Sequence, residues 1–521
     1  MEERVASTEE LQDGQMKQVE VGGKKVLLAK VEGAYFATGA RCPHYGGPLP
    51  EGTLHDGRVT CPWHQGTFDV RNGDLLEPPP LDAVPSFAVR VEGSDIYVDR
   101  PDDAKSQRPM PRCACDTARD ARTFAILGGG AAAQAAVEAL REEGFEGRIL
   151  VITQEDRWPY DRPNLSKDYL AGEMKADWLP LRSPGFYEKH GVERVTGRIT
   201  ALDVPTRTVT LEDGTSLSPD AVLVATGASP RTLEVPGADL VGVFTLRSWD
   251  DCDAIIAALE GAANAVVVGA SFIGMEVATS LLARGLSVTV VGPEAVPFAR
   301  VLGEPLGRTI MDLHEKKGTQ FRLGRSVTRF VGEGKVAAVE LDDGATLPAD
   351  VVVVGVGVVP NTAFVQGVAR DADGGLSVDE ELRLAPGVWA AGDVARYPEA
   401  HTGQRVRIEH WRLAQQHGRA AAASMAGRGR PFSGVPFFWT QQFTRAFDYV
   451  GAGQGFDDLI VCGDIEKRDF TALYAKGGKL VAACGTQSDE TGAFAALMRV
   501  GRLPAPDAVR GKQRAGLREL L

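Results

Sequence analysis

The sequence predicts a multidomain fold with a small all-β domain, an α/β core of two related domains and an α+β C-terminal domain. Three observations lead to this prediction. Short strand-like runs separated by glycine turns fill residues 15–100. Two segments, beginning at Thr123 and Ala265, each show the order strand, glycine-rich turn, helix and strand of a βαβ unit. The pattern around Leu211–Pro230 recurs 130 residues later around Leu341–Pro360, which indicates that the two core units are similar.

The predicted elements follow in order along the chain. In the all-β domain they are strands Met16–Val21, Lys25–Val31 and Ala34–Thr38. In the core they are strands Thr123–Leu127, Arg148–Thr153, Ala265–Val268 and Ser287–Val291, with helices ending near Glu143 and Arg284. The predicted boundaries are 1–100 for the all-β domain, 101–121 for an exposed proline-containing linker, 122–242 and 359–431 for the first core domain, 243–358 for the second and 432–521 for the C-terminal domain.

Composition excludes several classes of protein. The 521 residues carry a net charge of −13, which argues against a nucleic-acid or anionic-membrane binder. Seven cysteines are too few for a disulfide scaffold in a chain of this length. The longest apolar run, Val351–Val359, is too short for a membrane span, and the acidic N-terminus is no signal peptide. We therefore expect a cytoplasmic protein. Its oligomeric state stays open.

Two short cysteine–histidine motifs predict a metal centre in the all-β domain. Cys42-Pro-His44 and Cys61-Pro-Trp-His64 place two thiolates and two imidazoles on separate loops. A Cys₂His₂ zinc site would use the same ligands. The proline after each cysteine and the Gly-Gly-Pro loop instead favour a [2Fe–2S] cluster, with cysteines on one iron and histidines on the other.

These motifs resemble Rieske ferredoxins across residues 5–100. The resemblance implies the lower-potential ferredoxin type, because Gly47 and Trp63 occupy the places of the extra cysteines found in high-potential respiratory Rieske proteins.

Two glycine-rich turns predict dinucleotide binding. Gly128-x-Gly130-x-x-Ala133 follows a strand and opens a helix, and Glu155 ends the next strand, where a carboxylate binds ribose hydroxyls. In the second turn, Gly269-Ala-Ser271-Phe-Ile-Gly274, a serine replaces the central glycine.

The residues after the next strand bear on the choice of nicotinamide cofactor. Glu294 lies two residues beyond Gly292, at the end of that strand. An acidic residue there favours NADH, while NADPH stays possible.

Further segments resemble the FAD-dependent ferredoxin reductases and apoptosis-inducing-factor-like flavoproteins. They are Pro159–Lys167, the Ala225-Thr226-Gly227 turn and Gly387–Asp393, within residues 122–445. The resemblance implies FAD as cofactor, Lys167 and Glu276 as catalytic residues, and Trp439 beside the flavin. The expected cofactor-binding residues are Gly128, Gly130, Ala131, Ala133, Glu155, Arg162, Lys167, Ile199, Ala225, Thr226, Gly227, Gly269, Ser271, Ile273, Gly274, Glu294, Gly357, Gly392, Asp393 and Trp439.

The resemblance as a whole implies an NAD(P)H-dependent flavoprotein reductase with a fused Rieske cluster. Hydride would pass from NADH to FAD, and single electrons onward to the cluster or to an external acceptor such as a ferredoxin or oxygenase component. No cysteine lies between Cys115 and Cys252, which excludes thiol–disulfide exchange at the flavin. Two alternatives are an NAD(P)H oxidase or quinone-type reductase and an NADH-responsive redox-signalling protein.

The remaining histidines and cysteines carry no predicted chemistry. We expect His410 and His417 at the surface or beside the flavin, Cys113 and Cys115 as exposed thiols, and Cys252, Cys462 and Cys484 as packing residues.

Overall fold

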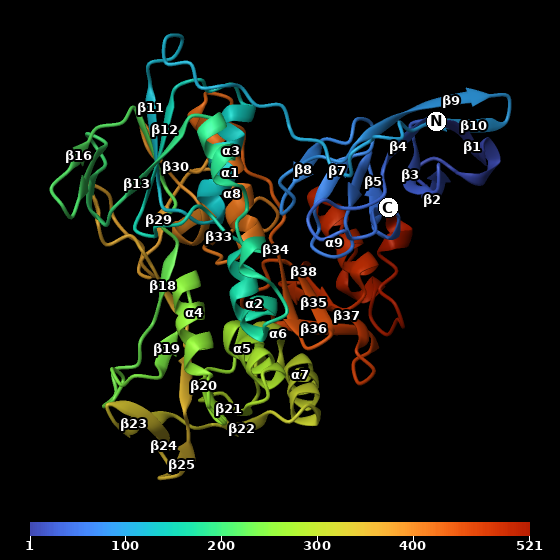
Figure 1. The fold of residues 1–521 in the computed structure, drawn as a ribbon. Helices are drawn as coiled ribbons and strands as arrows, with labels where there is room; N and C mark the ends of the chain where they lie inside the picture. The colour runs from blue at the N-terminus through green and yellow to red at the C-terminus, as the bar shows by residue number, and fades with distance from the viewer.

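The computed structural model describes all residues 1–521, and its N-terminal part is all-β (Figure 1). One antiparallel sheet has strand order β1-β10-β9-β4-β3-β2, and a smaller one has order β5-β6-β7-β8. The bounds are β1 Glu2–Ser7, β2 Met16–Val21, β3 Lys24–Val31, β4 Ala34–Gly39, β5 Thr53–His55, β6 Arg58–Thr60, β7 Thr67–Asp69, β8 Leu75–Glu77, β9 Ser86–Glu92 and β10 Asp95–Asp99. The three predicted strands are confirmed as β2, β3 and β4.

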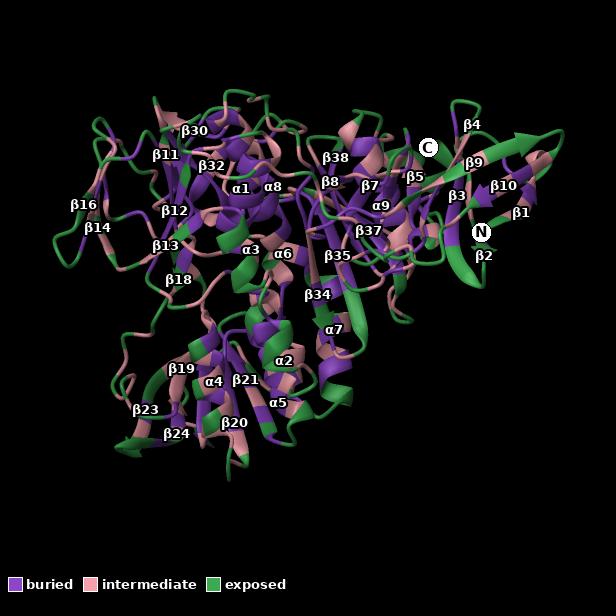
Figure 2. Cartoon of the chain, turned by 45° about the horizontal axis from the view of Figure 1, so that its top comes forward, coloured by how far each residue is buried: buried purple, intermediate pink, exposed green.

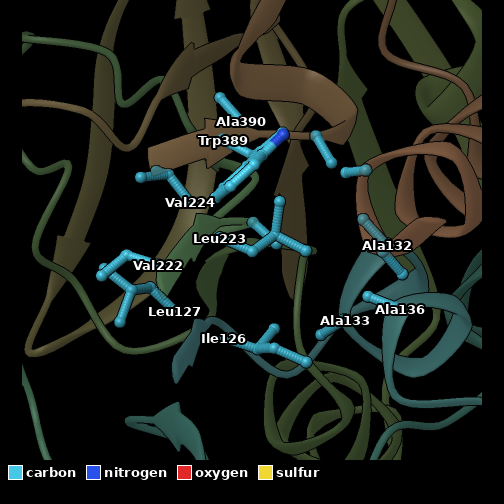
Figure 3. Packing of buried hydrophobic residues seen from close by; sticks show 14 of the residues in the cluster. Ile126, Leu127, Ala132, Ala133, Ala136, Val222, Leu223, Val224, Trp389 and Ala390 are labelled. Carbon is cyan, nitrogen blue, oxygen red and sulfur yellow. The ribbon is translucent and has the colours of Figure 1, made fainter. Parts of the chain in front are cut away.

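The first α/β sheet has order β13-β12-β11-β17-β31-β30, and all its pairs are parallel except β30 with β31. Helices α1 (Ala131–Glu142) and α8 (Trp411–Met425) pack together on this sheet. Ala132, Ala133 and Ala136 of α1 lie on the same side of the sheet as Leu223 of β17, whereas Val222 and Val224 point to the other side (Figure 3). The strands are β11 Thr123–Leu127, β12 Arg148–Thr153, β13 Val192–Thr196, β17 Ala221–Val224, β30 Arg383–Ala385 and β31 Val388–Ala390.

The second α/β sheet has order β19-β26-β20-β21-β22, all parallel. Its helices include α5 (Phe272–Ala283) and α7 (Glu304–Lys316). Its strands are β19 Val243–Thr245, β20 Asn264–Val268, β21 Ser287–Gly292, β22 Gln320–Leu323 and β26 Val351–Val354. The central strands of this sheet are buried and therefore drawn in purple in Figure 2. Such burial is expected for a parallel sheet, because helices or loops cover both of its faces.

The two halves of the sequence repeat meet directly. Strands β18 (Ala228–Pro230) and β27 (Val358–Pro360) occupy equivalent places in the repeat and pair with each other antiparallel. Ala228 lies opposite Pro360, and Pro230 lies opposite Val358. The chain therefore crosses between the two α/β sheets along one two-stranded ribbon.

The C-terminal part is an antiparallel sheet of order β34-β35-β38-β37-β36 with helix α9 (Ser488–Arg499). Its strands are β34 Phe437–Gln442, β35 Arg445–Gly451, β36 Asp458–Asp464, β37 Asp469–Lys476 and β38 Lys479–Gly485. Strand β34 contacts both α5 and α8, and α9 contacts β5 of the N-terminal part. In Figure 1 the blue N-terminal and red C-terminal parts accordingly lie side by side. No helix of the structure is long and apolar enough to cross a membrane.

Residues 101–121 contain no helix or strand, but the prediction that this linker is exposed throughout is wrong. The Arg112 side chain is only 3% exposed and pairs with Glu138 and, at 2.9 Å, with Glu142 on α1. Cys113 and Cys115 are only partly exposed, and their thiols donate to the backbone carbonyls of residues 145 and 147. The linker is therefore fixed along the first α/β domain.

Candidate active site and cluster loops

A cleft of about 1540 Å³ lies between the two α/β sheets and the C-terminal sheet. It is lined by 17 of the predicted site residues: Gly128, Gly130, Ala131, Glu155, Arg162, Lys167, Ile199, Ala225, Thr226, Gly227, Ser271, Ile273, Glu276, Gly357, Gly392, Asp393 and Trp439. Four predicted residues are not among its lining: Ala133, Gly269, Gly274 and Glu294. Ala133 is fully buried in the core, and Glu294 is exposed at the end of β21.

The first glycine turn can accept a dinucleotide pyrophosphate. Gly128 has φ +116°, and a Cβ there would lie 2.3 Å from the Ala225 carbonyl oxygen, so only glycine fits. Gly130 is the N-cap residue of α1, and a Cβ there would meet no other atom within 4 Å. The N-terminus of α1 is therefore accessible from the cleft. These residues fit a bound FAD.

Paired charged side chains line the same cleft. Glu155 accepts from the Tyr160 hydroxyl at 2.5 Å and pairs with Arg162 at 2.9 Å. Arg247 pairs with Asp393 at 3.0 Å. The two carboxylates therefore lie in the cleft with their orientations fixed, as groups that hold ribose or ribityl hydroxyls must be.

The second glycine turn is built alike. Gly269 has φ +115°, and a Cβ there would lie 2.2 Å from the Gly355 carbonyl oxygen. A Cβ at Gly274 would lie 2.0 Å from the Gly269 carbonyl, so Gly274 serves the close packing of α5 on its strand. Ser271 caps α5 without a side-chain hydrogen bond to the helix and lines the cleft, so its hydroxyl is available to a ligand.

Lys167 and Glu276, 109 positions apart in the sequence, both line the cleft and contact each other. The Lys167 ammonium lies 2.7 Å from Glu276 Oε2, which also accepts from the Ser166 hydroxyl at 2.6 Å. The Thr440 hydroxyl donates to Oε1 of the same carboxylate at 2.7 Å. Glu276 is therefore no solvated helix residue: it is 4% exposed and has three donors. The contribution of Thr440 had no sequence signal.

The cluster loops bring the four predicted ligands together as two pairs. His44 Nδ1 and His64 Nδ1 lie 3.1 Å apart, and Cys42 interacts with Cys61, which raises the pKa of Cys42 and lowers that of Cys61. Burial lowers the pKa of His64 to about 4 and that of His44 well below its usual value. Both imidazoles are therefore neutral at pH 7, the form that binds metal.

The donors form one pair of histidines and one pair of cysteines. A cysteine pair and a separate histidine pair are what one iron each requires in a Rieske cluster. A Cβ at Gly47 would lie 2.6 Å from the Cys61 sulfur. Only glycine therefore lets the first cluster loop lie so close to this ligand.

The histidine edge of the cluster site faces the cleft. The His64 and Trp439 rings lie 4.4 Å apart between centroids, and Trp439 lines the cleft. The neighbouring Tyr45 hydroxyl donates to Asp161 Oδ2 at 2.8 Å and accepts from the Asn164 amide at 2.7 Å. Asn164 also donates to Asp161 Oδ2 at 2.9 Å. Burial raises the pKa of Asp161, although the hydrogen bonds that it accepts from Tyr45 and Asn164 act to lower it. Tyr45 thus anchors the first cluster loop to the segment Pro159–Lys167.

The second cluster loop is anchored by α8. Arg412, 2% exposed, donates to the carbonyls of Gln65 at 3.1 Å and Pro78 at 2.8 Å. Glu77, at the end of β8, pairs with Arg499 of α9 at 3.0 Å and accepts from Gln416 at 2.6 Å. Partners from α8 and α9 therefore fix the position of the all-β domain beside the cleft.

The remaining predictions concern two histidines and three cysteines. His417 is fully buried and accepts from the Gly392 backbone N–H at 3.3 Å, so a surface position is wrong. His410 lines the cleft directly. Cys252, Cys462 and Cys484 are buried, as packing residues are.

Comparison with known proteins agrees with this geometry. Residues 2–88 match the Rieske [2Fe-2S] domain, residues 122–418 the pyridine nucleotide-disulphide oxidoreductase model, and residues 437–521 the reductase C-terminal model. Human apoptosis-inducing factor 3 is 38% identical over 501 residues, covering 94% of this chain and 82% of the relative. Rhodocoxin reductase from Rhodococcus erythropolis is 34% identical, covering 69% and 85%.

Solved structures agree as well. The crystal structure of the covalent putidaredoxin reductase–putidaredoxin complex is similar with TM-score 0.71 and 30% identity, covering 74% of this chain and 95% of that one. The matched domains imply FAD, NAD(P)H and a [2Fe–2S] cluster as cofactors. The chain therefore belongs to the pyridine nucleotide-disulphide oxidoreductase family, as a ferredoxin-reductase-like enzyme with a fused Rieske domain.

Proposed function

We propose that this reductase delivers electrons from NADH to its own Rieske cluster before any external acceptor. The observation that carries the proposal is the His64–Trp439 contact, which joins a cluster ligand to the wall of the cleft. When bound, FAD supplies the conversion of a two-electron donor into one-electron steps. The protein's task is then to hold donor and acceptor side by side.

The residues predicted to bind FAD and the cluster would have the following tasks. Gly128 and Gly130 admit the FAD pyrophosphate to the N-terminus of α1. Glu155 holds a ribose hydroxyl, and Asp393 the ribityl chain. Cys42 and Cys61 bind one iron, and His44 and His64 the other.

Lys167 and Glu276 act where hydride transfer occurs. The Lys167 ammonium supplies positive charge to the part of the flavin that gains electrons, and Glu276 keeps that ammonium in place at 2.7 Å. Both side chains are nearly buried, so their charges interact more strongly than they would in water.

NADH is the proposed hydride donor, and a separate protein the proposed final acceptor. Glu294, at the end of β21, would bind the adenosine ribose of NADH and repel the 2′-phosphate of NADPH. The relatives named as ferredoxin reductases support a ferredoxin-type acceptor. We also propose that the domains have the boundaries expected from the sequence and that the protein is cytoplasmic.

An anaerobic titration of the holoenzyme with NADH tests the proposal. Flavin absorbance should fall first, and the EPR signal of a reduced Rieske cluster should follow without any added mediator. A Cys61→Ser variant, which removes one iron ligand, should keep flavin reduction and lose the EPR signal. Reduction of the flavin with a cluster that stays oxidised in the wild type would refute internal electron delivery.

A further inference from the structure

A buried chain of hydrogen bonds leads from the active-site carboxylate to helix α7. Thr440 Oγ1 lies 2.7 Å from Glu276 Oε1, and Gln442 Nε2 lies 2.8 Å from Thr440 Oγ1. His314 Nε2 then lies 2.8 Å from Gln442 Oε1, and His314 Nδ1 lies 3.1 Å from the Thr319 hydroxyl. All five side chains are buried. This chain of hydrogen bonds joins α5 and α7 of the second α/β domain to β34 of the C-terminal sheet.

The direction of donation follows from chemistry. The amide oxygen of Gln442 can only accept, so His314 must carry its proton on Nε2, and its Nδ1 accepts from Thr319. The amide nitrogen of Gln442 can only donate, so it donates to the Thr440 oxygen. The single proton of the Thr440 hydroxyl is then directed to Glu276. Every member of the chain is satisfied in this arrangement.

The other side of the Glu276 carboxylate receives only donors as well. Ser166 donates to Oε2 at 2.6 Å, and Lys167 does so at 2.7 Å. Three donors and no acceptor face the carboxyl group, which is the environment of an ionised carboxylate held in one orientation. Burial lowers the pKa of His314 to about 4, so at pH 7 the far end of the chain adds no competing charge.

We propose that Thr440 is a positioning residue for hydride transfer, holding Glu276 so that its second oxygen stays aimed at Lys167, with Gln442 and His314 fixing the Thr440 hydroxyl. The C-terminal domain thereby completes the active site instead of only covering it. The inference rests on the proposed role of the Lys167–Glu276 pair. It concerns the reduction of the flavin and is independent of whether electrons then reach the cluster.

Rapid mixing of the holoenzyme with NADH tests this role through the flavin-reduction rate. Thr440→Val removes the hydroxyl but keeps the shape, and we expect reduction to slow about tenfold, a typical effect of losing one hydrogen bond to a charged group. Thr440→Ser should restore the rate to within about twofold of wild type. The dissociation constant of NADH should stay the same, because the lost interaction concerns the orientation of Glu276.

Thr471→Val is the matched control. Thr471 is fully buried in the same sheet, and its hydroxyl donates to Gln487 instead of Glu276. It should lose stability like Thr440→Val while keeping the wild-type rate. Equal losses of rate in the two valine variants, or an unchanged rate in Thr440→Val, would overturn the proposal.

Nitrogen-15 NMR of the histidines gives a second reading that does not depend on turnover. The hydrogen-bond chain requires the Nε2–H tautomer of His314, identified by comparison with a His314→Gln variant. The Nδ1–H tautomer would reverse the chain and overturn the proposed direction. If the wild-type cluster stays oxidised while Thr440→Val slows flavin reduction, internal delivery fails and the positioning role stands.

Discussion

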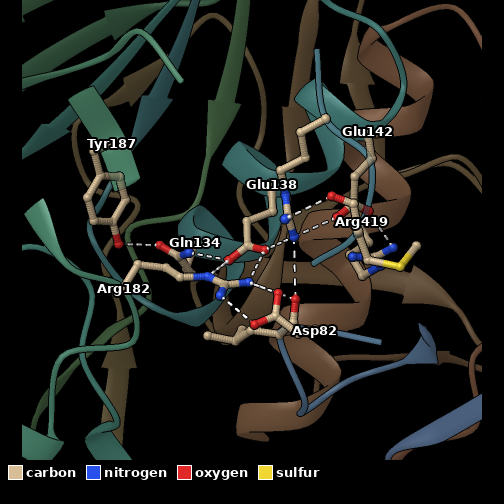
Figure 4. A network of polar contacts seen from close by, with 10 residues as sticks. Asp82, Gln134, Glu138, Glu142, Arg182, Tyr187 and Arg419 are labelled. Carbon is tan, nitrogen blue, oxygen red and sulfur yellow. Dashed lines mark hydrogen bonds and ion pairs between the residues drawn. The ribbon is translucent and has the colours of Figure 1, made fainter. Parts of the chain in front are cut away.

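Arg182 holds Asp82 by two hydrogen bonds of 2.8 and 2.9 Å, across the boundary between the all-β domain and the first α/β domain. The same guanidinium contacts Glu138 of α1 at 2.9 and 3.0 Å. Figure 4 shows this network, in which Arg182 lies between the two carboxylates. Bidentate pairs of this kind fix orientation as well as distance. The cluster-bearing domain is thus held rigidly against the reductase core.

Removing Arg182 should loosen that attachment. In Arg182→Gln, the buried Asp82 carboxylate loses its counter-charge, and we expect the free energy of unfolding to fall by about 3–5 kcal/mol. Urea denaturation measures this change. Arg148→Gln is the control, because the Arg148–Glu193 pair is half exposed and should contribute less than about 1 kcal/mol. A loss as small as that of the control would show that the contact does not hold the domains together.

Trp439 should govern the rate at which the cluster is reduced. In Trp439→Ala the ring against His64 is lost, and we expect cluster reduction to slow about tenfold, or 1.4 kcal/mol of activation free energy. Trp439→Phe should retain most of the rate. Stopped-flow absorbance at cluster wavelengths provides the measurement. Trp178→Ala, at a 70% exposed tryptophan, serves as control and should leave the rate unchanged. A wild-type rate in Trp439→Ala would place the route elsewhere.

Acid should weaken the junction at Glu77. Burial alone would raise the pKa of Glu77, but Arg499 and Arg412 outweigh it and lower that pKa to about 2 from its usual 4.5. Because the folded-state pKa lies below the unfolded one, the stabilisation is complete above about pH 5 and is lost as pH falls towards 2. The difference corresponds to about 3 kcal/mol.

Unfolding free energies measured between pH 7 and pH 3 test this dependence. Glu77→Gln removes the titrating carboxylate and should flatten the profile relative to wild type. Glu193→Gln, in the half-exposed pair with Arg148, should change the slope far less than Glu77→Gln does. Parallel profiles for Glu77→Gln and wild type would refute the assignment.

Glu294 should set the preference for NADH. Replacing it by arginine puts a positive charge at the end of β21, where the 2′-phosphate of NADPH would lie. We expect KM for NADPH to fall about tenfold and KM for NADH to rise, a change of about 1.4 kcal/mol in binding. Steady-state kinetics with both cofactors provide the measurement. Glu333→Arg makes the same charge change on β23 (Val327–Glu333), and should alter neither value.

The local motifs were predictable because each depends on residues close in sequence. The strand, glycine turn and helix at Gly128 need only about twenty neighbouring residues, and the Cys42 and Cys61 motifs carry their own turn chemistry. The 130-residue repeat correctly indicated two related sheets.

The contacts between domains were not predictable. Arg412 and Gln65 are 347 residues apart, and nothing in either local sequence indicates the other. Arg112 is buried because Glu138 and Glu142 accept it, and a linker's composition does not report such partners. Thr440 likewise has an ordinary position in a strand, and its task becomes visible only when β34 lies beside α5.

The ribbon of β18 and β27 has one more consequence. Ala228 and Val358 are equivalent in the repeat, as are Pro230 and Pro360. Ala228 pairs with Pro360, and the equivalent Val358 pairs with the equivalent Pro230. The register is therefore symmetric about the Ser229–Val359 pair. Both crossings between the two α/β domains therefore share one ribbon, so a change in either strand alters the pairing of the other.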